Sequence, residues 1–273
     1  MSKTARKSKE WTDTKLKTRI NQGRGQGEEE YQPWLKVADI PSRGRVTRLF
    51  SRKMNRTIHL FSDLQTMHYY QLEFDHRVQF VKEQYPLLDL VDIVGKLDEP
   101  LLKRLKNSDG TPHIIITTFL ISAKDDNGNL FTYARSIKAG AEIEKKSVLE
   151  RLEIQRQYYS SLNVDWAVIT EKEINYARGR NIEWALPALN TSDYGLTEEE
   201  VKRNSVNLID ALQNNPKNPV KNQIESFERE YRLNPGTGMF LFRYLIASKQ
   251  IEVNMDVQIN VHESPQMMSL TAR

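Results

Sequence analysis

Two polar residues at the end of one expected strand, Ser136 and Lys138, are placed so that both side chains could contribute to one reaction site. Ser136 and Lys138 end an extended run at residues 130–138, and side chains two apart on a strand point the same way, so they share one face. A lysine at the end of an otherwise apolar strand can stabilise negative charge that develops on a phosphodiester during hydrolysis. Hydrolysis with Mg²⁺ also needs carboxylates that converge on the metal. A site of this kind would therefore take one acid from a neighbouring helix and another from a neighbouring strand.

The composition excludes several other reaction centres. The 273 residues include no cysteine, which rules out thiol nucleophiles, thiolate zinc sites and disulfides. No glycine-rich loop follows a strand and opens a helix as a phosphate-binding loop does. The five histidines include no pair four residues apart, so a histidine metal site on one helix face is not predicted. Because the sequence has neither a signal-peptide segment nor a long apolar span, we expect a cytoplasmic protein without membrane contact.

The elements that would position Ser136 and Lys138 follow from residue types. Runs rich in β-branched and aromatic residues at 113–121 and 130–138 flank a turn at 125–129, which predicts an antiparallel pair of strands. Ser62 and Gln65 form a capping-box pattern that opens a helix to about residue 75, which gives Gln65 a structural role. The other expected elements are a helix at 13–21, a hairpin of strands 45–51 and 57–61, an edge strand at 78–87, a short helix around 101–106, a helix at 146–162 and a strand at 164–170. Strands flanked by helices predict an α/β domain over residues 1–170.

Residues 171–273 have a mostly helical pattern and are predicted to form a second domain. Thr197 and Glu200 form another capping box, which opens a helix to about residue 212. Further helices are expected at 220–231 and 239–249, and an alternating pattern at 251–257 predicts an edge strand. Three helices followed by a strand fit a helix-turn-helix domain with a wing, and they fit a plain interaction domain equally well.

Positive charge is concentrated in two places, although 40 Lys and Arg against 36 Asp and Glu give a formal net charge of only +4. Residues 1–26 carry eight bases against two acids. The loop of the expected hairpin lies within a second cluster of six bases in fourteen residues: Arg43, Arg45, Arg48, Arg52, Lys53 and Arg56. Such a density of like charge repels itself unless a polyanion is bound, so these six residues are predicted to bind DNA.

Six short segments, in order along nearly the whole chain, carry a family resemblance: PWL at 33–35, SDL at 62–64, EQYPL at 83–87, LERLE at 149–153, EKEIN at 171–175 and NIEW at 181–184. Together they resemble the TnsA endonuclease of heteromeric Tn7-like transposons. The resemblance implies a restriction-endonuclease-like, PD-(D/E)xK N-terminal domain and a winged-helix-like C-terminal domain. It also implies work on transposon-end DNA beside the DDE transposase TnsB and the AAA+ regulator TnsC. In that family TnsA uses Mg²⁺ to cut the 5′ ends, while TnsB cuts and joins the 3′ ends.

The chain departs from the family at the active-site positions that the resemblance implies. Gln65 stands where the family has its helix glutamate, Thr118 aligns with the strand aspartate, and Ser136 replaces the Gln or Glu that precedes the lysine. Lys138 alone is retained. Neutral amides and hydroxyls do not supply the negative charge that holds Mg²⁺ against its hydration shell, and Glu73 lies about 12 Å along the helix from Gln65. The sequence therefore predicts a nuclease-deficient subunit, without a bound metal, that binds transposon ends and bridges TnsB and TnsC.

Two other interpretations stay open. In the first, the protein is an active Mg²⁺-dependent endonuclease that cuts the 5′ ends with rearranged acids or with a partner's carboxylate. In the second, it is a DNA-binding regulator unrelated to transposition. Under the nuclease-deficient interpretation, Lys138 would have no carboxylate or metal beside it. Because an unpaired ammonium away from water is costly, Lys138 is expected to reach solvent, a DNA phosphate or an acid from elsewhere in the chain. The protein would be bacterial and would join the nucleoid when assembled on DNA.

Overall fold

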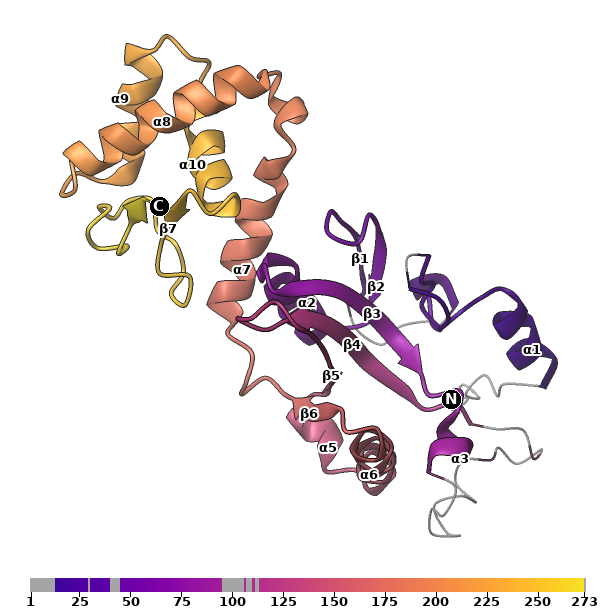
Figure 1. Ribbon diagram of the computed structural model, residues 1–273. Coiled ribbons are helices and arrows are strands. Elements are labelled where there is room, and N and C mark those ends of the chain that lie inside the picture. The colour runs from indigo at the N-terminus through magenta and orange to yellow at the C-terminus, as the bar shows by residue number, and fades with distance from the viewer. Residues whose placement is uncertain are drawn as a thin grey trace, which may run out of the picture. The chain divides into compact units, whose positions relative to one another are not determined.

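The structure is a computed structural model that describes residues 13–28, 30–39, 45–94, 106, 110 and 113–272. The chain divides into two units, Met1–Ile174 and Asn175–Arg273 (Figure 1). Arg43 and nearly all of the helix expected at 101–106 lie outside the described residues. In the part of the chain that the structure describes, no helix is both long enough and apolar enough to cross a membrane.

A four-stranded mixed sheet forms the centre of the N-terminal unit (Figure 1). Its strands lie in the order β3 (Val78–Pro86), β4 (Ile116–Lys124), β5 (Leu130–Ile137) and β6 (Asp165–Ile169). The first two pairings are antiparallel and the pairing of β5 with β6 is parallel. The turn between β4 and β5 is closed by Asp125, whose Oδ1 accepts hydrogen bonds from two backbone N–H groups, and by Gly128 at φ +83°. The predicted antiparallel pair is therefore confirmed, as is the edge strand β3.

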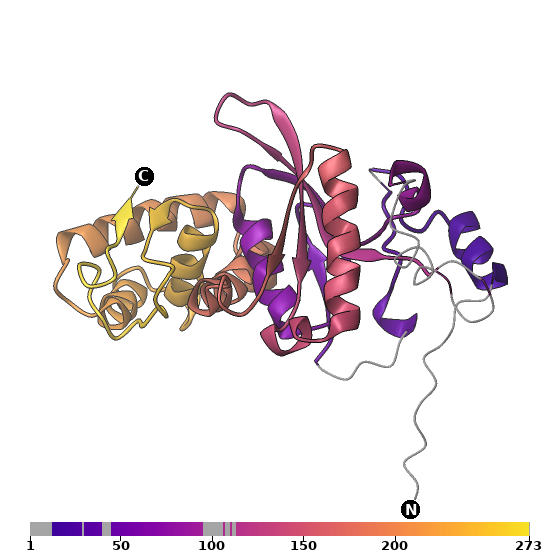
Figure 2. The same cartoon turned by 90° about the horizontal axis from the view of Figure 1, so that it is seen from below.

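Two helices cover opposite faces of this sheet (Figure 2). The helix α2 (Asp63–Phe74) packs Met67, Tyr69 and Leu72 against strand residues that include Phe119, Ile121 and Ile137. The helix α6 (Lys146–Ser161) packs Ile154, Tyr158 and Tyr159 against the other face, which includes Leu120 and Ala134. This alternation along β4 follows from the two-residue period of a strand. The short helix α5 (Gly140–Ile143) and α6 connect β5 to its parallel neighbour β6.

The remaining described elements of this unit are a two-stranded hairpin and three short helices. A hairpin of β1 (Thr47–Ser51) and β2 (Arg56–Leu60) pairs Thr47 with Leu60 and Ser51 with Arg56, which confirms the predicted hairpin. Arg56 is the first residue of β2 rather than part of the loop. The helix α1 (Asp13–Asn21) has the predicted bounds, and η1 (Val37–Asp39) and α3 (Leu90–Ile93) are single turns.

The C-terminal unit is helical, as its sequence pattern predicts. Its elements are α7 (Tyr176–Ala185), η2 (Leu186–Leu189), η3 (Thr191–Tyr194), α8 (Glu198–Asn214), α9 (Val220–Glu230), α10 (Thr237–Ala247), β7 (Ile251–Glu252) and β8 (Thr271–Ala272). Both halves of the capping box between Thr197 and Glu200 are present. Helix α7 was not predicted from the sequence. Its start is marked by Asn175, whose side chain accepts a hydrogen bond from the Arg178 N–H. The apolar helix α10 packs against α7, α8 and α9.

The strand predicted at 251–257 is wrong beyond its first two residues. Only Ile251 and Glu252 pair, with Ala272 and Thr271 of β8. The chain then turns at Asn254, whose side chain accepts the Asp256 N–H. The Asp256 carboxylate faces α7, where it accepts hydrogen bonds from Asn175 and Arg178. The alternation of apolar and polar residues at 251–257 comes from a polar turn that is bonded to α7, which explains why a strand was wrongly predicted. The winged-helix assignment stays a prediction.

Candidate functional site

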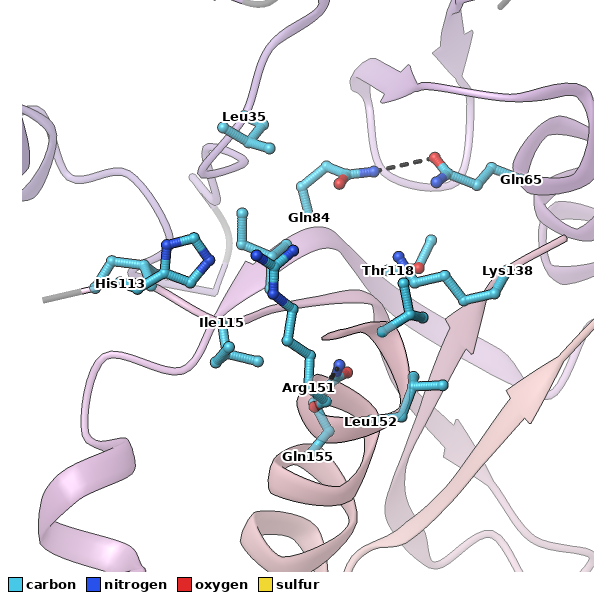
Figure 3. Close-up of a pocket in the computed structure, with 13 residues that line it drawn as sticks. Leu35, Gln65, Gln84, His113, Ile115, Thr118, Lys138, Arg151, Leu152 and Gln155 are labelled. Carbon is cyan, nitrogen blue, oxygen red and sulfur yellow. Dashed lines mark hydrogen bonds between the residues drawn. The ribbon is translucent and has the colours of Figure 1, made fainter. Parts of the chain in front are cut away.

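A pocket of about 260 Å³ on the N-terminal unit brings together three of the four predicted site residues (Figure 3). Gln65 comes from the first turn of α2, Thr118 from β4, and Lys138 from the residue that follows β5. Other polar side chains also line the pocket: Gln84, His113, Arg151 and Gln155. Apolar residues complete its wall: Leu35, Ile114, Ile115, Ile116, Val148 and Leu152. Ser136 does not line the pocket, because it is buried between β5 and α6.

The sheet is irregular where it borders this pocket. Gln84 has φ +51°, a left-handed conformation uncommon for a side-chain-bearing residue, between the regular pairs Glu83–Phe119 and Tyr85–Thr117. The ladder between β4 and β5 ends at the pair of Phe119 and Arg135. Beyond it, the Thr118 hydroxyl replaces a backbone acceptor and receives the Ile137 N–H at 2.9 Å. Thr118 is thus part of the hydrogen bonding that finishes the sheet.

Gln65 is held by the start of α2, as its position in a capping pattern predicts. Its backbone N–H donates to the Ser62 Oγ at 3.2 Å, which confirms Ser62 as the N-cap. The reciprocal bond is displaced by one residue, because the Gln65 Oε1 accepts the N–H of Phe61 at 2.9 Å. The same oxygen also accepts the Gln84 Nε2 at 3.1 Å (Figure 3). The one Gln65 atom able to ligate a cation therefore already accepts two hydrogen bonds.

Ser136 belongs to a buried network of polar side chains between the sheet and α6. The Gln155 Oε1 accepts from the Ser136 Oγ at 2.6 Å and from the Thr117 Oγ1 at 3.1 Å. Trp166 donates to the Ser136 Oγ, and the Tyr159 hydroxyl donates to the Thr117 Oγ1. These bonds satisfy groups that would otherwise be costly to bury, so Ser136 serves helix–sheet packing.

Two acids of the N-terminal unit, Glu73 on α2 and Glu83 on β3, have structural partners. The Glu73 carboxylate accepts from the Ser51 hydroxyl, the Lys53 N–H and the Tyr69 hydroxyl. Glu83 is fully buried and accepts both terminal nitrogens of Arg56, at 2.9 and 2.7 Å. Within the described residues no group of three or more His, Asp or Glu is placed to hold a metal. A donor set of neutral amides and hydroxyls that already make hydrogen bonds does not fit Mg²⁺, which prefers charged oxygen ligands.

Lys138 and Arg151 give the pocket a positive character. Burial lowers the pKa of Lys138, the Glu142 carboxylate partly offsets this effect, and the Arg151 guanidinium lowers the pKa further. Burial and Arg151 also lower the pKa of His113. Among the described residues Lys138 makes no hydrogen bond or ion pair through its ammonium, and Glu142 is the acid whose charge acts on it. Of the three outcomes expected for Lys138, a close acid partner is not found in the described part of the chain.

The basic hairpin residues fall into two groups. Arg45, Arg48 and Arg52 are exposed, with Arg45 3.8 Å from the Asp63 carboxylate. Lys53 and Arg56 have structural partners, since the Lys53 Nζ donates to the carbonyls of Leu72 and Asp75 at the end of α2 and Arg56 pairs with Glu83. Within the described part of the chain, Arg48 and Arg52 can meet a phosphate without breaking an ion pair of the fold, whereas Arg45 would have to leave Asp63.

Comparison with known proteins places the chain in a family. The model of the TnsA-like endonuclease N terminal matches residues 75–171, and that of the TnsA endonuclease C terminal matches residues 173–255. The chain is 30% identical over 260 residues to the transposon Tn7 transposition protein TnsA of Escherichia coli, which covers 92% of this chain and 89% of that protein. The chain belongs to the TnsA family. Thr118, Ser136, Lys138 and Arg151 lie within the matched TnsA N-terminal residues, and Gln65 precedes them.

Three residues that line the pocket were not predicted from the sequence: Gln84, Arg151 and Gln155. Gln155 carried a signal, because it stands among apolar residues on the inward face of α6. A glutamine at such a position is buried only when its amide is satisfied, which here requires the hydroxyls of Thr117 and Ser136. Gln84 lies in the EQYPL segment of the TnsA resemblance, but nothing in the sequence indicates its left-handed backbone.

Proposed function

We propose that the protein is a TnsA subunit of a Tn7-type transposition complex that binds transposon-end DNA and connects a TnsB-like transposase to a TnsC-like AAA+ regulator without cutting the 5′ ends itself. The observation that carries this proposal is the pocket around Lys138, where Gln65 and Thr118 stand at two of the family's metal-binding positions and Ser136, at the third, is buried against Gln155. Membership of the TnsA family supports the role in transposition. The polar contacts of the three residues support the loss of cleavage.

The charge at the pocket supports a deficient nuclease over an active one with rearranged acids. A phosphodiester that is attacked by water gains negative charge in the transition state. In a metal-dependent nuclease, carboxylates hold the metal that positions the phosphodiester, and a nearby cation stabilises the developing charge. Lys138 can supply the positive charge, but it supplies neither a base nor a metal ligand. Among the acids that could take over, Glu73 and Glu83 are bound to structural partners, and Glu142, whose charge acts on Lys138, does not line the pocket.

We propose that the exposed arginines of the β1–β2 hairpin contact DNA phosphates. Arg48→Ala combined with Arg52→Ala is expected to weaken binding of end DNA and of unrelated DNA alike, because phosphate contacts carry no sequence information. The slope of log K against log salt should fall by about two. Fluorescence anisotropy over a series of KCl concentrations measures both quantities.

A matched control removes two exposed charges elsewhere, with Lys124→Ala on β4 and Arg156→Ala on α6. This variant is expected to keep the wild-type salt slope. Unchanged binding by the Arg48 and Arg52 variant, or a loss confined to one DNA sequence, would contradict the assignment.

We propose that residues 175–273 carry the contact to the AAA+ regulator. This unit has its own buried core, formed by side chains of α8, α9 and α10, and a capped first turn on α8. Its three packed helices beside the short β7–β8 pair also support a winged-helix-like arrangement. Because the unit has its own core, the isolated fragment is expected to fold and to retain the regulator in a pull-down.

The reciprocal fragment, residues 1–174, is the control for that pull-down and is expected to leave the regulator in solution. Retention of the regulator by the N-terminal fragment alone would remove this assignment.

A further inference from the structure

The hairpin of β1 and β2 is a two-stranded ribbon with two different faces. Its inner face packs apolar side chains, among them Ile58 and Leu60, into the core together with side chains of α2. On its outer face Arg48, Phe50 and Thr57 are exposed, and Phe50 and Thr57 are paired across the two strands. Phe50 is 63% exposed. The ribbon therefore presents one large aromatic side chain to solvent in the middle of a polar, basic face.

The charge of this ribbon indicates what kind of molecule would cover Phe50. Residues 45–60 include five Lys and Arg residues and no Asp or Glu. Arg48 on β1 and Arg52, which directly follows β1, are exposed and stand two positions before and two positions after Phe50. A surface with this charge attracts a polyanion. Nucleic acid is therefore a better match than an apolar protein surface for the ring between these arginines.

The ribbon is fixed to the rest of the unit before any ligand binds. The Glu73 carboxylate on α2 accepts the Ser51 hydroxyl at 2.6 Å and the Lys53 N–H at 3.1 Å. The Lys53 ammonium donates to the Leu72 carbonyl at 3.1 Å. These bonds attach the loop that carries Arg52 to the last turns of α2. Because the loop is already ordered, binding of a ligand does not have to offset the cost of ordering it.

The spacing of the two arginines suits the major groove of DNA. A strand rises about 3.3 Å per residue, so Arg48 and Arg52 lie up to about 13 Å apart along the ribbon. The major groove is about 12 Å wide, whereas the minor groove is about 6 Å wide. If the ribbon lies across the major groove, the arginines meet phosphates on its two sides. Phe50, midway between them, then points toward the edges of the bases.

We propose that the outer face of the β1–β2 ribbon lies across the major groove of transposon-end DNA, with Arg48 and Arg52 on the phosphates of opposite strands and Phe50 against the C5-methyl group of a thymine. The inference rests on the proposed function, because it requires that these arginines meet end DNA. Phenylalanine has no hydrogen-bonding group, and the thymine methyl is the apolar group that suits it in the major groove. The arginines position the ribbon, and Phe50 reads a base pair.

The first test separates base reading from phosphate binding. Phe50→Ala in the full chain is expected to weaken binding to an end-DNA duplex about tenfold, because a contact of the ring with an apolar group is lost. Binding to a duplex of G·C pairs alone should be unchanged, since that duplex has no thymine methyl. The salt slope should equal that of the wild type, because no charge is removed. Fluorescence anisotropy over a series of KCl concentrations measures all three.

Phe131→Ala is the matched control, because it removes an exposed phenylalanine from β5 of the same unit. It is expected to bind both duplexes like the wild type. Wild-type affinity of Phe50→Ala for end DNA, or an equal loss on both duplexes, would overturn the inference. Loss of the TnsB-type transposase with unchanged DNA affinity would overturn it as well and assign Phe50 to a protein interface. If the wild type itself failed to bind end DNA, the proposed function would fail instead.

A second arm locates the methyl group on the DNA. Each thymine of the end duplex is replaced in turn by uracil, which lacks only the C5-methyl group. One position is expected to weaken the wild type about fourfold and to leave Phe50→Ala unaffected, which is the signature of a direct contact in a double-mutant cycle. The scan uses the wild-type protein, so it remains informative even if Phe50→Ala perturbs folding.

Insertion of the ring between base pairs is the alternative contact with the same DNA. It predicts that no single thymine matters and that the fluorescence of 2-aminopurine at one base step rises when the wild type binds but not when Phe50→Ala binds. That outcome would overturn the contact with a thymine methyl.

Discussion

In a reaction with transposon-end DNA, its TnsB-type transposase and Mg²⁺, the wild-type chain is expected to leave the 5′ ends uncut. Cleavage should be at least about a thousandfold slower than in a TnsA that has its carboxylates, because a single stabilising donor already contributes about 10²–10³ and three positions have changed. The 3′ ends would still be cut and joined by the transposase. The products would then be branched molecules, which replication resolves into cointegrates, and strand-specific end labels distinguish them from excised element.

Restoring the family residues together is expected to produce 5′ cleavage where single reversions do not. Metal ligands act as a unit, so Gln65→Glu, Thr118→Asp or Ser136→Gln alone should leave activity at background. The triple variant has to displace three contacts of the fold: the bond from the Ile137 N–H to Thr118, the bond from Ser136 to Gln155 and the bond from Trp166 to Ser136. A glutamine at 136 also needs more room than a side chain that is 1% exposed now has. Partial rescue is therefore expected, well below a natural TnsA.

Lys138→Met in the triple background is the control for that rescue, and it should return cleavage to background. Efficient double-strand excision that depends on the wild-type subunit would show that another set of acids works in this pocket. Glu142 would then be the first candidate, because it is the acid whose charge acts on Lys138.

Much of the fold was predictable from local patterns because its strands and helices are strongly periodic. The run at 113–121, the turn at Asp125 and Gly128, and the run at 130–138 combine into β4 and β5 without any help from distant residues. The capped helices at Ser62 and Thr197 begin where their side-chain hydrogen bonds require. The predicted strand at 251–257 failed because the fate of Asp256 is decided by Arg178, which is 78 positions away in the sequence.

The residues of the candidate site could be predicted from the sequence, but the partners of their side chains could not. Family resemblance gave Gln65, Thr118, Ser136 and Lys138, and three of these line one pocket. That Ser136 turns instead to α6 depends on Gln155 and Trp166, which lie far along the chain. The separation of the hairpin bases into exposed and structural groups was equally hidden, since Arg56 differs from Arg52 only through Glu83 on another strand. The density of basic residues in a sequence does not distinguish a side chain that is exposed and could bind DNA from one that is already ion-paired within the fold.

Glu83→Gln is expected to destabilise the N-terminal unit by about 3–5 kcal/mol, a large effect for a nearly isosteric change. Burial raises the pKa of Glu83, and the bidentate bond from Arg56 offsets part of that rise. Arg56 is itself largely buried, with its guanidinium over the Tyr31 ring and bonded to the Val81 carbonyl. The substitution leaves this guanidinium charged and without its carboxylate, and that uncompensated charge is the cause of the loss. Urea unfolding followed by the fluorescence of buried Trp34 measures it.

Removing both charges should cost less than removing one. Glu83→Leu with Arg56→Met replaces the pair with apolar side chains of similar length, and buried ion pairs replaced in this way are often close to neutral in stability. Arg77→Gln is the comparison at the surface, where the exposed pair with Asp75 should contribute no more than about 1 kcal/mol. A double variant as unstable as Glu83→Gln would mean that the Glu83 position stabilises the unit by packing and by its bond to the His59 N–H rather than by charge. The expected order, with the single variant least stable, follows only if Arg56 is a buried cation that depends on Glu83, and that dependence also keeps Arg56 from serving as a DNA contact.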